Sequence, residues 1–394
     1  MPRLNEKHQW YQHTILLLII VVGFTVRFIL ANGRFNQDLQ SFVVNAELFR
    51  QGVPNFYLVQ PVYGYPPLWY YICGLLGVFQ RTFGISSFAL VERMFLSLVD
   101  LGIMFILMAL AKRRGTNPLI VAALFFLSPI SIIISAYHGQ FDNVTLFFVV
   151  TAILALEQNH WKRFSREIVA FISLTLALLL KQAIIFHVFT VFLAFSKKRI
   201  TGILLTGCSV ILFFLSFLPF IEGALGPMKD TMNRYGGILG TYGISYIAFM
   251  YCGQCSISIL GMNFWVFLRN IFMVLMIVYI YFNRHKDIAR SSLLMTLFFY
   301  TFTSGIAPQY FVYPLVFGAL FPSKWFLLYS VVTSIFLMGH WDELNITALQ
   351  TINYNTVWIT VVLWYISELI RTNTTAHALY TKARELGSST HTTS

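Results

Sequence analysis

The chain alternates between long apolar runs and short polar segments. A helix needs roughly 17–25 mainly apolar residues to cross a bilayer, and about twelve runs are candidates: 14–31, 93–111, 118–136, 143–157, 168–180, 183–195, 200–220, 263–283, 290–306, 308–321, 324–339 and 356–370. The stretch 168–195 is divided because it is too long for one straight helix and carries Lys181 and Gln182 near its middle. The pattern predicts an all-α polytopic integral membrane protein, with residues 1–394 as one membrane-embedded domain and both termini on the same side.

Basic clusters divide the loops into two faces. They lie at residues 3–7, 112–114, 162–166, 197–199, 284–290, 324 and 371–384. Lys and Arg concentrate in cytoplasmic loops, and all these clusters share one face only if the apolar stretch 66–83 does not cross. We therefore interpret 66–83 as a re-entrant or interfacial helix in a long first external loop, 32–92. The other long external loop, 221–262, has a role that the pattern does not reveal.

Composition supports the membrane assignment. Hydrophobic residues make up 57% of the chain and charged residues 11%, with a mean hydropathy of +0.71, whereas soluble domains carry about 25% charged residues. This excludes a soluble enzyme and a disordered chain. The net charge of +12 comes from short clusters between apolar runs and not from a basic face, so no nucleic-acid partner is expected.

Metal binding is not predicted. Cys252 and Cys255 have the spacing of half a zinc site, but zinc needs four ligands and the chain has no second pair. A disulfide and two free thiols remain alternatives for these residues.

Asp38 is the first candidate for catalysis, because it stands just past the end of the first apolar run. A partly desolvated carboxylate has a raised pKa, which suits a general base. The alternative is an N-cap of the amphipathic stretch that follows, 40–52.

A polar turn and a lone cation are the next candidates. His138, Gln140 and Asp142 lie between two apolar runs, where Gly139 permits a tight turn. Ionisable groups at membrane depth are functional candidates, although a satisfied interhelical turn would look the same. Lys181 is isolated in an apolar run, which favours a buried anionic partner over snorkelling to the interface.

Other external polar groups complete the set. Tyr65 precedes Pro66 and Pro67, which predict a helix start at the membrane interface. Arg234 offers a planar fork of donors that suits phosphate. Gln182, Gln309 and Tyr310 lie in or beside the predicted external segments.

Five segments, in order along the chain, resemble the GT-C superfamily of polytopic glycosyltransferases. Asn36–Asp38 and the amphipathic stretch after it resemble the loop that carries the catalytic acid of this superfamily. Tyr63–Leu68 is similar to the Tyr-Pro-Pro-Leu element of the dolichyl-phosphate-glucose glucosyltransferases of N-glycan assembly. His138–Phe141 resembles their His-Gly-His-Phe turn and Leu180–Gln182 their Lys-Gln pair, and Gln309–Phe311 resembles the Gln-Tyr-Phe of the GPI-anchor mannosyltransferases. The chain departs from the family in having one acid in its first motif and Gln140 in place of the second His.

The resemblance implies inverting transfer of mannose or glucose from a polyprenyl-phosphate sugar to a glycan or lipid-linked acceptor. Asp38 would deprotonate the acceptor hydroxyl, and the leaving phosphate would need positive charge or hydrogen-bond donors. The implied substrate-binding residues are Lys181, His138, Arg234, Gln140, Asp142, Tyr65, Gln182, Gln309 and Tyr310. No cofactor or metal is expected, and Lys181→Met is expected to fold at least as well as the parent but to bind donor poorly.

The site would face the extracytoplasmic side of a prokaryotic plasma membrane, or the lumen of the endoplasmic reticulum in a eukaryote. The alternative function is a multi-span lipid or solute transporter or flippase. It explains a buried Lys and Asp equally well, but it predicts polar residues along a path to both faces.

Overall fold

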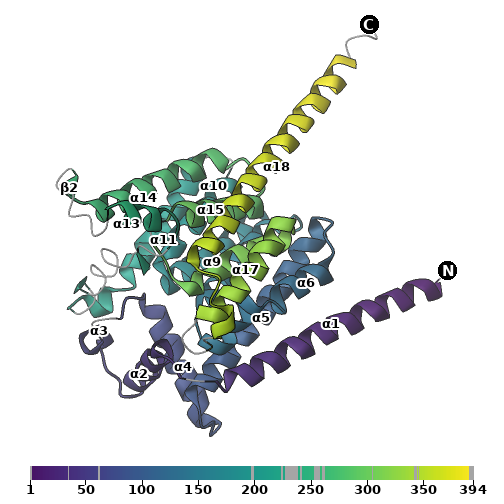
Figure 1. Ribbon diagram of the computed structural model, residues 1–394. Coiled ribbons are helices and arrows are strands. Elements are labelled where there is room, and N and C mark those ends of the chain that lie inside the picture. The colour runs from purple at the N-terminus through teal and green to yellow at the C-terminus, as the bar shows by residue number, and fades with distance from the viewer. Residues whose placement is uncertain are drawn as a thin grey trace.

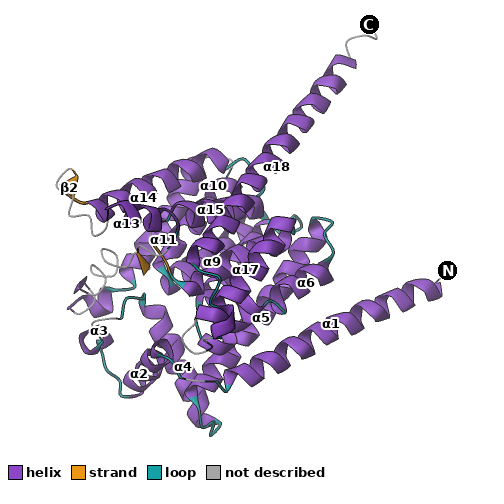
Figure 2. Cartoon of the chain, in the orientation of Figure 1, coloured by secondary structure: helices purple, strands orange, loops and turns teal. Residues whose placement is uncertain are grey.

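The computed structural model describes residues 2–33, 35–60, 63–196, 199–222, 225–226, 238–239, 242–252, 258–259, 262–303, 305–340, 344 and 346–389. The predicted all-α class is confirmed, because helices make up 82% of these residues (Figure 2). The strands described are two residues long. β1 (Ile238–Leu239) pairs antiparallel with β4 (Gly305–Ile306), and β2 (Ser258–Ile259) pairs with β3 (Met262–Asn263).

Four helices in the described part of the chain are long and apolar enough to cross a membrane. They are Trp10–Ala31 of α1 (Pro2–Ala31), α5 (Phe88–Arg113), Arg199–Phe220, formed by α11 (Arg199–Leu215) and η3 (Leu218–Phe220), and α14 (Phe264–Asn283). A fifth candidate is bent by 45° between α6 (Pro118–Phe126) and the segment formed by α7 (Pro129–Ile132) and η1 (Ile133–His138). All five coincide with predicted spans. Large apolar side chains on their outer surfaces, such as Leu18, Phe28 and Val274, are exposed, as expected for helices that contact lipid.

The predicted count of about twelve spans is not confirmed. Several predicted spans are helices of 9–15 residues: α8 (Asp142–Leu156), α10 (Ile185–Phe195), α15 (Ile288–Phe302) and α16 (Val312–Leu320). At 1.5 Å per residue such helices are shorter than a hydrocarbon core of about 30 Å. The candidate spans also exclude α9 (Arg163–Leu180), α17 (Lys324–His340) and α18 (Tyr354–Ser389).

The predicted break at Lys181 and Gln182 is confirmed. α9 ends at Leu180, Lys181 is extended with φ −152° and ψ 119°, and the short helix η2 (Gln182–Ile184) leads into α10. Lys181 therefore lies between two helices, near the middle of the apolar stretch.

Three short helices cover one end of the bundle, and both chain termini project away from that end (Figure 1). They are α2 (Gln37–Arg50), α3 (Phe56–Val59) and α4 (Pro67–Thr82). α4 begins at Pro67, where Pro-Pro predicts a helix start, and packs on α2 through the edge-to-face contact of Phe42 with Trp69. α4 is not among the candidate spans; that it does not cross the membrane stays a prediction.

Ion pairs join two of the basic clusters to neighbouring helices. Arg114, after α5, binds Glu157 at the end of α8 at 2.5 Å and Asp287 before α15 at 3.1 Å. Arg290 on α15 pairs with Glu368 on α18. The clusters at 112–114 and 284–290 thus lie close together, as the two-face topology requires.

Candidate active site

Asp38 lies in the first turn of α2, but it does not cap the helix. The N-cap is Asn36, whose side-chain oxygen accepts a hydrogen bond from the backbone N–H of Leu39 at 2.9 Å. The N-cap alternative for Asp38 is therefore wrong. Its carboxylate instead accepts hydrogen bonds from His138 and Gln140, about a hundred residues away in the turn between η1 and α8.

The contacts of His138 determine which ring nitrogen carries the proton. The amide nitrogen of Asn36 lies 3.2 Å from Nδ1 of His138 and donates to its backbone oxygen at 2.7 Å. The side-chain oxygen of Asn36 already accepts a hydrogen bond from Leu39, so the amide group that faces the ring is the nitrogen, which can only donate. Nδ1 of His138 is then the acceptor of this hydrogen bond. Nε2 then carries the hydrogen and donates it to Oδ2 of Asp38 at 3.1 Å. His138 thus orients an ionised Asp38.

The expected rise in the pKa of Asp38 is wrong. Burial does raise the pKa of this carboxyl, but hydrogen bonds from His138 and Gln140 and the positive charge of Lys181 outweigh that effect and place the pKa below its usual value. The reason is that these groups stabilise the charged form. The Asp38 side chain is 40% exposed, so a proton donor can reach it.

Gly139 shapes the turn that carries His138 and Gln140. Its φ of +78° is left-handed, a conformation that favours glycine, and a Cβ there would lie 2.7 Å from Oε2 of Glu92 and 2.9 Å from Cδ2 of Leu39. Glu92 was not predicted as a site residue. It is fully buried on α5, and among the described residues neither of its carboxylate oxygens has a hydrogen-bond partner.

Lys181 has the buried anionic partner that its isolation predicts. Its ammonium lies 2.7 and 2.8 Å from the two carboxylate oxygens of Asp142, at the start of α8, and both side chains are nearly inaccessible to solvent. Tyr313 on α16 adds a hydrogen bond from its hydroxyl to Oδ1 of Asp142 at 3.0 Å. Snorkelling is therefore wrong for Lys181; Tyr313 was not predicted.

Aromatic rings surround the Lys181 ammonium. It lies 4.4 Å from the ring centre of Tyr310, 5.6 Å from that of Phe141 and 5.8 Å from that of Tyr65. Such contacts are favourable to a desolvated cation. The Gln182 side chain donates to the backbone oxygen of Gly64 at 3.2 Å, which holds the segment that carries Tyr65 beside Lys181.

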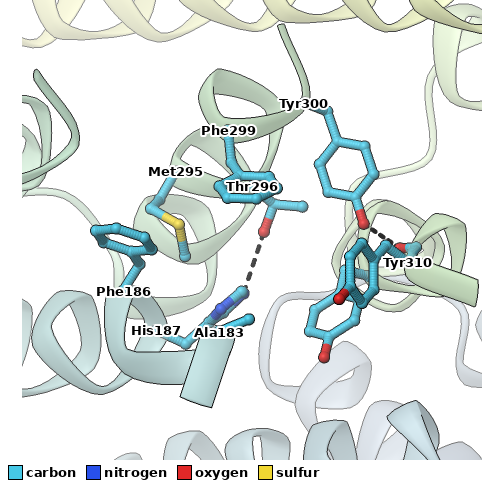
Figure 3. Close-up of a pocket in the computed structure, with 9 residues that line it drawn as sticks. Ala183, Phe186, His187, Met295, Thr296, Phe299, Tyr300 and Tyr310 are labelled. Atoms are coloured by element: carbon cyan, nitrogen blue, oxygen red, sulfur yellow. Dashed lines mark hydrogen bonds between the residues drawn. The ribbon is translucent and has the colours of Figure 1, made fainter. Parts of the chain in front are cut away.

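A pocket lies beside the Lys181–Asp142 pair. It is lined by Ala183, Phe186, His187, Met295, Thr296, Phe299, Tyr300, Tyr310 and Tyr313 (Figure 3). Figure 3 draws two polar contacts: Nε2 of His187 lies 3.2 Å from the Thr296 hydroxyl, and the Tyr300 hydroxyl donates to the backbone oxygen of Tyr310. Tyr310 and Tyr313 belong both to this wall and to the surroundings of the ion pair. The pocket is therefore apolar with a charged pair behind two of its tyrosines.

The remaining predicted residues are placed as follows. Gln309 is buried next to Tyr310 in η4 (Pro308–Phe311). Arg234 lies outside the described residues, as does Cys255, so neither the phosphate role of the first nor the pairing of the second is tested. Within the described ranges, no group of three His, Cys, Asp or Glu side chains could hold a metal ion.

Two ionisable residues inside predicted spans were also not predicted. Arg27 on α1 and Asp100 on α5 form a fully buried ion pair at 3.1 Å. The signal was present in the sequence, because each is an isolated charge in an apolar run, the same feature that singles out Lys181.

Comparison with protein-family models, with curated proteins and with solved structures finds no match for this chain. What supports a function is therefore the geometry above and the five motifs.

Proposed function

We propose that this protein is a membrane glycosyltransferase that moves mannose or glucose from a polyprenyl-phosphate sugar to a glycan or lipid-linked acceptor on the extracytoplasmic face. Asp38 is the general base, and Lys181 binds the phosphate.

One observation carries the proposal: a half-exposed carboxylate and a buried ammonium belong to the same site. Asp38 accepts hydrogen bonds from His138 and Gln140, and Asp142, two residues after Gln140, binds the ammonium of Lys181. Glycosyl transfer with a phosphate leaving group needs these two functions together, a base for the acceptor and positive charge for the leaving group.

The reaction is balanced without further groups. The acceptor oxygen forms a bond to the anomeric carbon, and its proton passes to Asp38. The bond from the anomeric carbon to the phosphate oxygen breaks, and the electron pair leaves with polyprenyl phosphate. The ammonium of Lys181 stabilises that phosphate by binding both the phosphate and the carboxylate of Asp142. Tyr65 and Tyr310, whose rings are near the ammonium, offer apolar faces to the sugar.

The test uses the full chain purified into lipid nanodiscs. Radiolabelled polyprenyl-phosphate glucose and polyprenyl-phosphate mannose are supplied in turn, with membrane lipids extracted from the source cells as acceptor. We expect labelled product and free polyprenyl phosphate with one of the donors. In Asp38→Asn, which keeps the size of the side chain, turnover should fall by about 10²–10⁴-fold.

A matched control is Asp287→Asn. Asp287 has a half-exposed carboxylate that binds Arg114, and both residues are far from Asp38 in the sequence. This variant should turn over like the parent. Near-normal turnover of Asp38→Asn at equal protein yield would contradict the assignment of the base, and no consumption of either donor would contradict the function.

The alternative is a lipid or solute transporter, and the buried Arg27–Asp100 pair is the observation that favours it, because charges at membrane depth often mark substrate paths. In proteoliposomes, a transporter would move fluorescently labelled polyprenyl-phosphate sugar between leaflets without cleaving it. The glycosyltransferase would release polyprenyl phosphate instead.

A further inference from the structure

Asp100 on α5 is a buried carboxylate that accepts four hydrogen bonds. Oδ2 accepts from Ser131 at 2.8 Å, from Ser135 at 2.6 Å and from Arg27 at 3.1 Å, and Oδ1 accepts from Asn143. All five side chains are fully buried. The donors come from α1 and from the consecutive elements α7, η1 and α8, so one carboxylate on α5 joins the first helix to the segment 131–143.

Two of these donors flank the turn that binds Asp38. Ser135 comes before His138 on η1, and Asn143 follows Gln140 on α8. The segment between them contains both hydrogen-bond donors to Asp38. Both ends of this segment are therefore hydrogen-bonded to the buried carboxylate of Asp100, Ser135 to Oδ2 and Asn143 to Oδ1.

The backbone of this segment needs such support. η1 is a π-helix, a form that is rare and that is frequently found at functional sites, and Gly139 then turns the chain through a left-handed conformation. Residues in sparsely populated conformations persist only where the surrounding structure holds them.

We propose that Asp100 is a positioning residue that holds the turn bearing His138 and Gln140 in place against Asp38. Asp100 does not touch substrate; it acts through Ser135 and Asn143. The catalytic consequence rests on the proposed function, whereas the attachment of the turn does not.

Three variants test the attachment. Ser135→Ala removes the hydroxyl that donates to Asp100 and that also lies 2.7 Å from the backbone oxygen of Ser131, and it leaves the Arg27–Asp100 pair intact. The double variant Arg27→Met/Asp100→Leu removes the carboxylate without leaving an unpaired buried charge, which is the tolerated way to replace a buried pair. Ser292→Ala is the matched control, since Ser292 is fully buried on α15 and its hydroxyl donates to the backbone oxygen of Ile288 at 2.9 Å.

Hydrogen–deuterium exchange in nanodiscs is the first measurement. We expect peptides covering residues 133–142 to exchange faster in Ser135→Ala, and faster still in the double variant, with no change in Ser292→Ala. This readout does not need activity, so it decides the attachment even if the parent transfers no sugar. Parent-like exchange in Ser135→Ala would overturn the proposal, whether or not the double variant folds.

The pH dependence of kcat is the second measurement, because a merely structural role would not move it. The groups that face Asp38 through hydrogen bonds or charge are His138, Gln140, Lys181, Glu92 and Asp142. Loosening the turn weakens the hydrogen bonds that lower the pKa of Asp38, so the acid limb of the profile should move to higher pH.

The rate should also fall, by about 10²-fold for a displacement near 1 Å. A lower yield of active protein with an unmoved acid limb and a parent-like kcat would show that Asp100 serves stability alone. If the parent has no transferase activity, the proposed function fails, and exchange alone then decides the role of Asp100.

Discussion

Lys181 and Asp142 provide the sharpest test of how charge is kept inside this bundle. From the sequence alone, Lys181→Met removes a costly buried cation and is expected to fold at least as well as the parent. The structure reverses this expectation, because the ammonium is bound to both oxygens of a carboxylate with no exposed side-chain surface. In Lys181→Met that carboxylate keeps the hydrogen bond from Tyr313 but loses its counter-charge.

The magnitude follows from the asymmetry of buried pairs. Removing one partner typically costs about 3–5 kcal/mol, whereas replacing both by apolar residues of similar volume is often neutral or stabilising by about 1–4 kcal/mol. We therefore expect the free energy of unfolding to fall by about 3–5 kcal/mol in Lys181→Met and to return to near the parent value in Lys181→Met/Asp142→Leu. The unpaired Asp142 can take up a proton and lose its charge, which keeps the fall in the free energy of unfolding near the lower end of this range.

The assay is reversible unfolding in mixed detergent micelles. It is applied to the parent, Lys181→Met, Asp142→Leu and the double variant, which together form a double-mutant cycle. Lys324→Met is the control: Lys324 is exposed at the start of α17, and its replacement should change the free energy of unfolding by no more than about 0.5 kcal/mol. The reasoning is refuted if Lys181→Met unfolds with the free energy of the parent, or if the double variant is no more stable than the single ones.

The folded double variant also isolates the role of Lys181 in binding. It should bind polyprenyl-phosphate donor poorly although it is stable, and Lys181→Arg should restore binding only in part, because a planar fork does not reproduce a compact point charge. Parent-like donor affinity in the double variant would remove Lys181 from the phosphate site.

Three further predictions concern the loops. The fold lowers the pKa of Asp38 below its ordinary value of 3.8, so the ionised carboxylate stabilises the folded state at any pH above the unfolded pKa. Both this stabilisation and the turnover should be lost only as the pH falls through the lower pKa of the folded state. A pH–rate profile that declines near pH 6 would contradict this. Gly139→Ala and Gly115→Ala both place Ala at positive φ, which should cost each variant about 1–2 kcal/mol of stability. Only the Cβ at residue 139 would also crowd its neighbours, so the thermal midpoint of Gly139→Ala should fall further than that of Gly115→Ala. Equal falls in the two midpoints would show that the turn relaxes around the added methyl group. Cysteines introduced at Gln51 and Arg81, before and near the end of 66–83, should react with impermeant thiol reagents from the same side of the membrane, and labelling from opposite sides would mean that 66–83 crosses.

Composition and local pattern determined the class of this protein and several local features. A chain with 11% charged residues has too few polar groups to cover its apolar surface in water, so helices that face lipid were expected, and four described helices are long and apolar enough to cross a membrane. The helix start at Pro67 and the break at Lys181 were predictable because both depend on residues next to one another. The anionic partner of Lys181 was predictable in kind, because a lone ammonium in an apolar run must be offset, but its identity as Asp142 was not.

Only the tertiary structure decided how many apolar runs are long helices and which polar groups meet. Hydropathy does not distinguish a helix that faces lipid from one buried in protein, so short interior helices such as α8 and α16 look like spans in the sequence. The pKa of Asp38 could not be predicted in sign, since burial and hydrogen bonding act in opposite directions and the donors, His138 and Gln140, lie far away along the chain. Asp100 collects donors from α1 and from the segment 131–143 for the same reason: a buried carboxylate takes its partners from whatever helices pack around it, and packing is a property of the folded bundle, not of any one run.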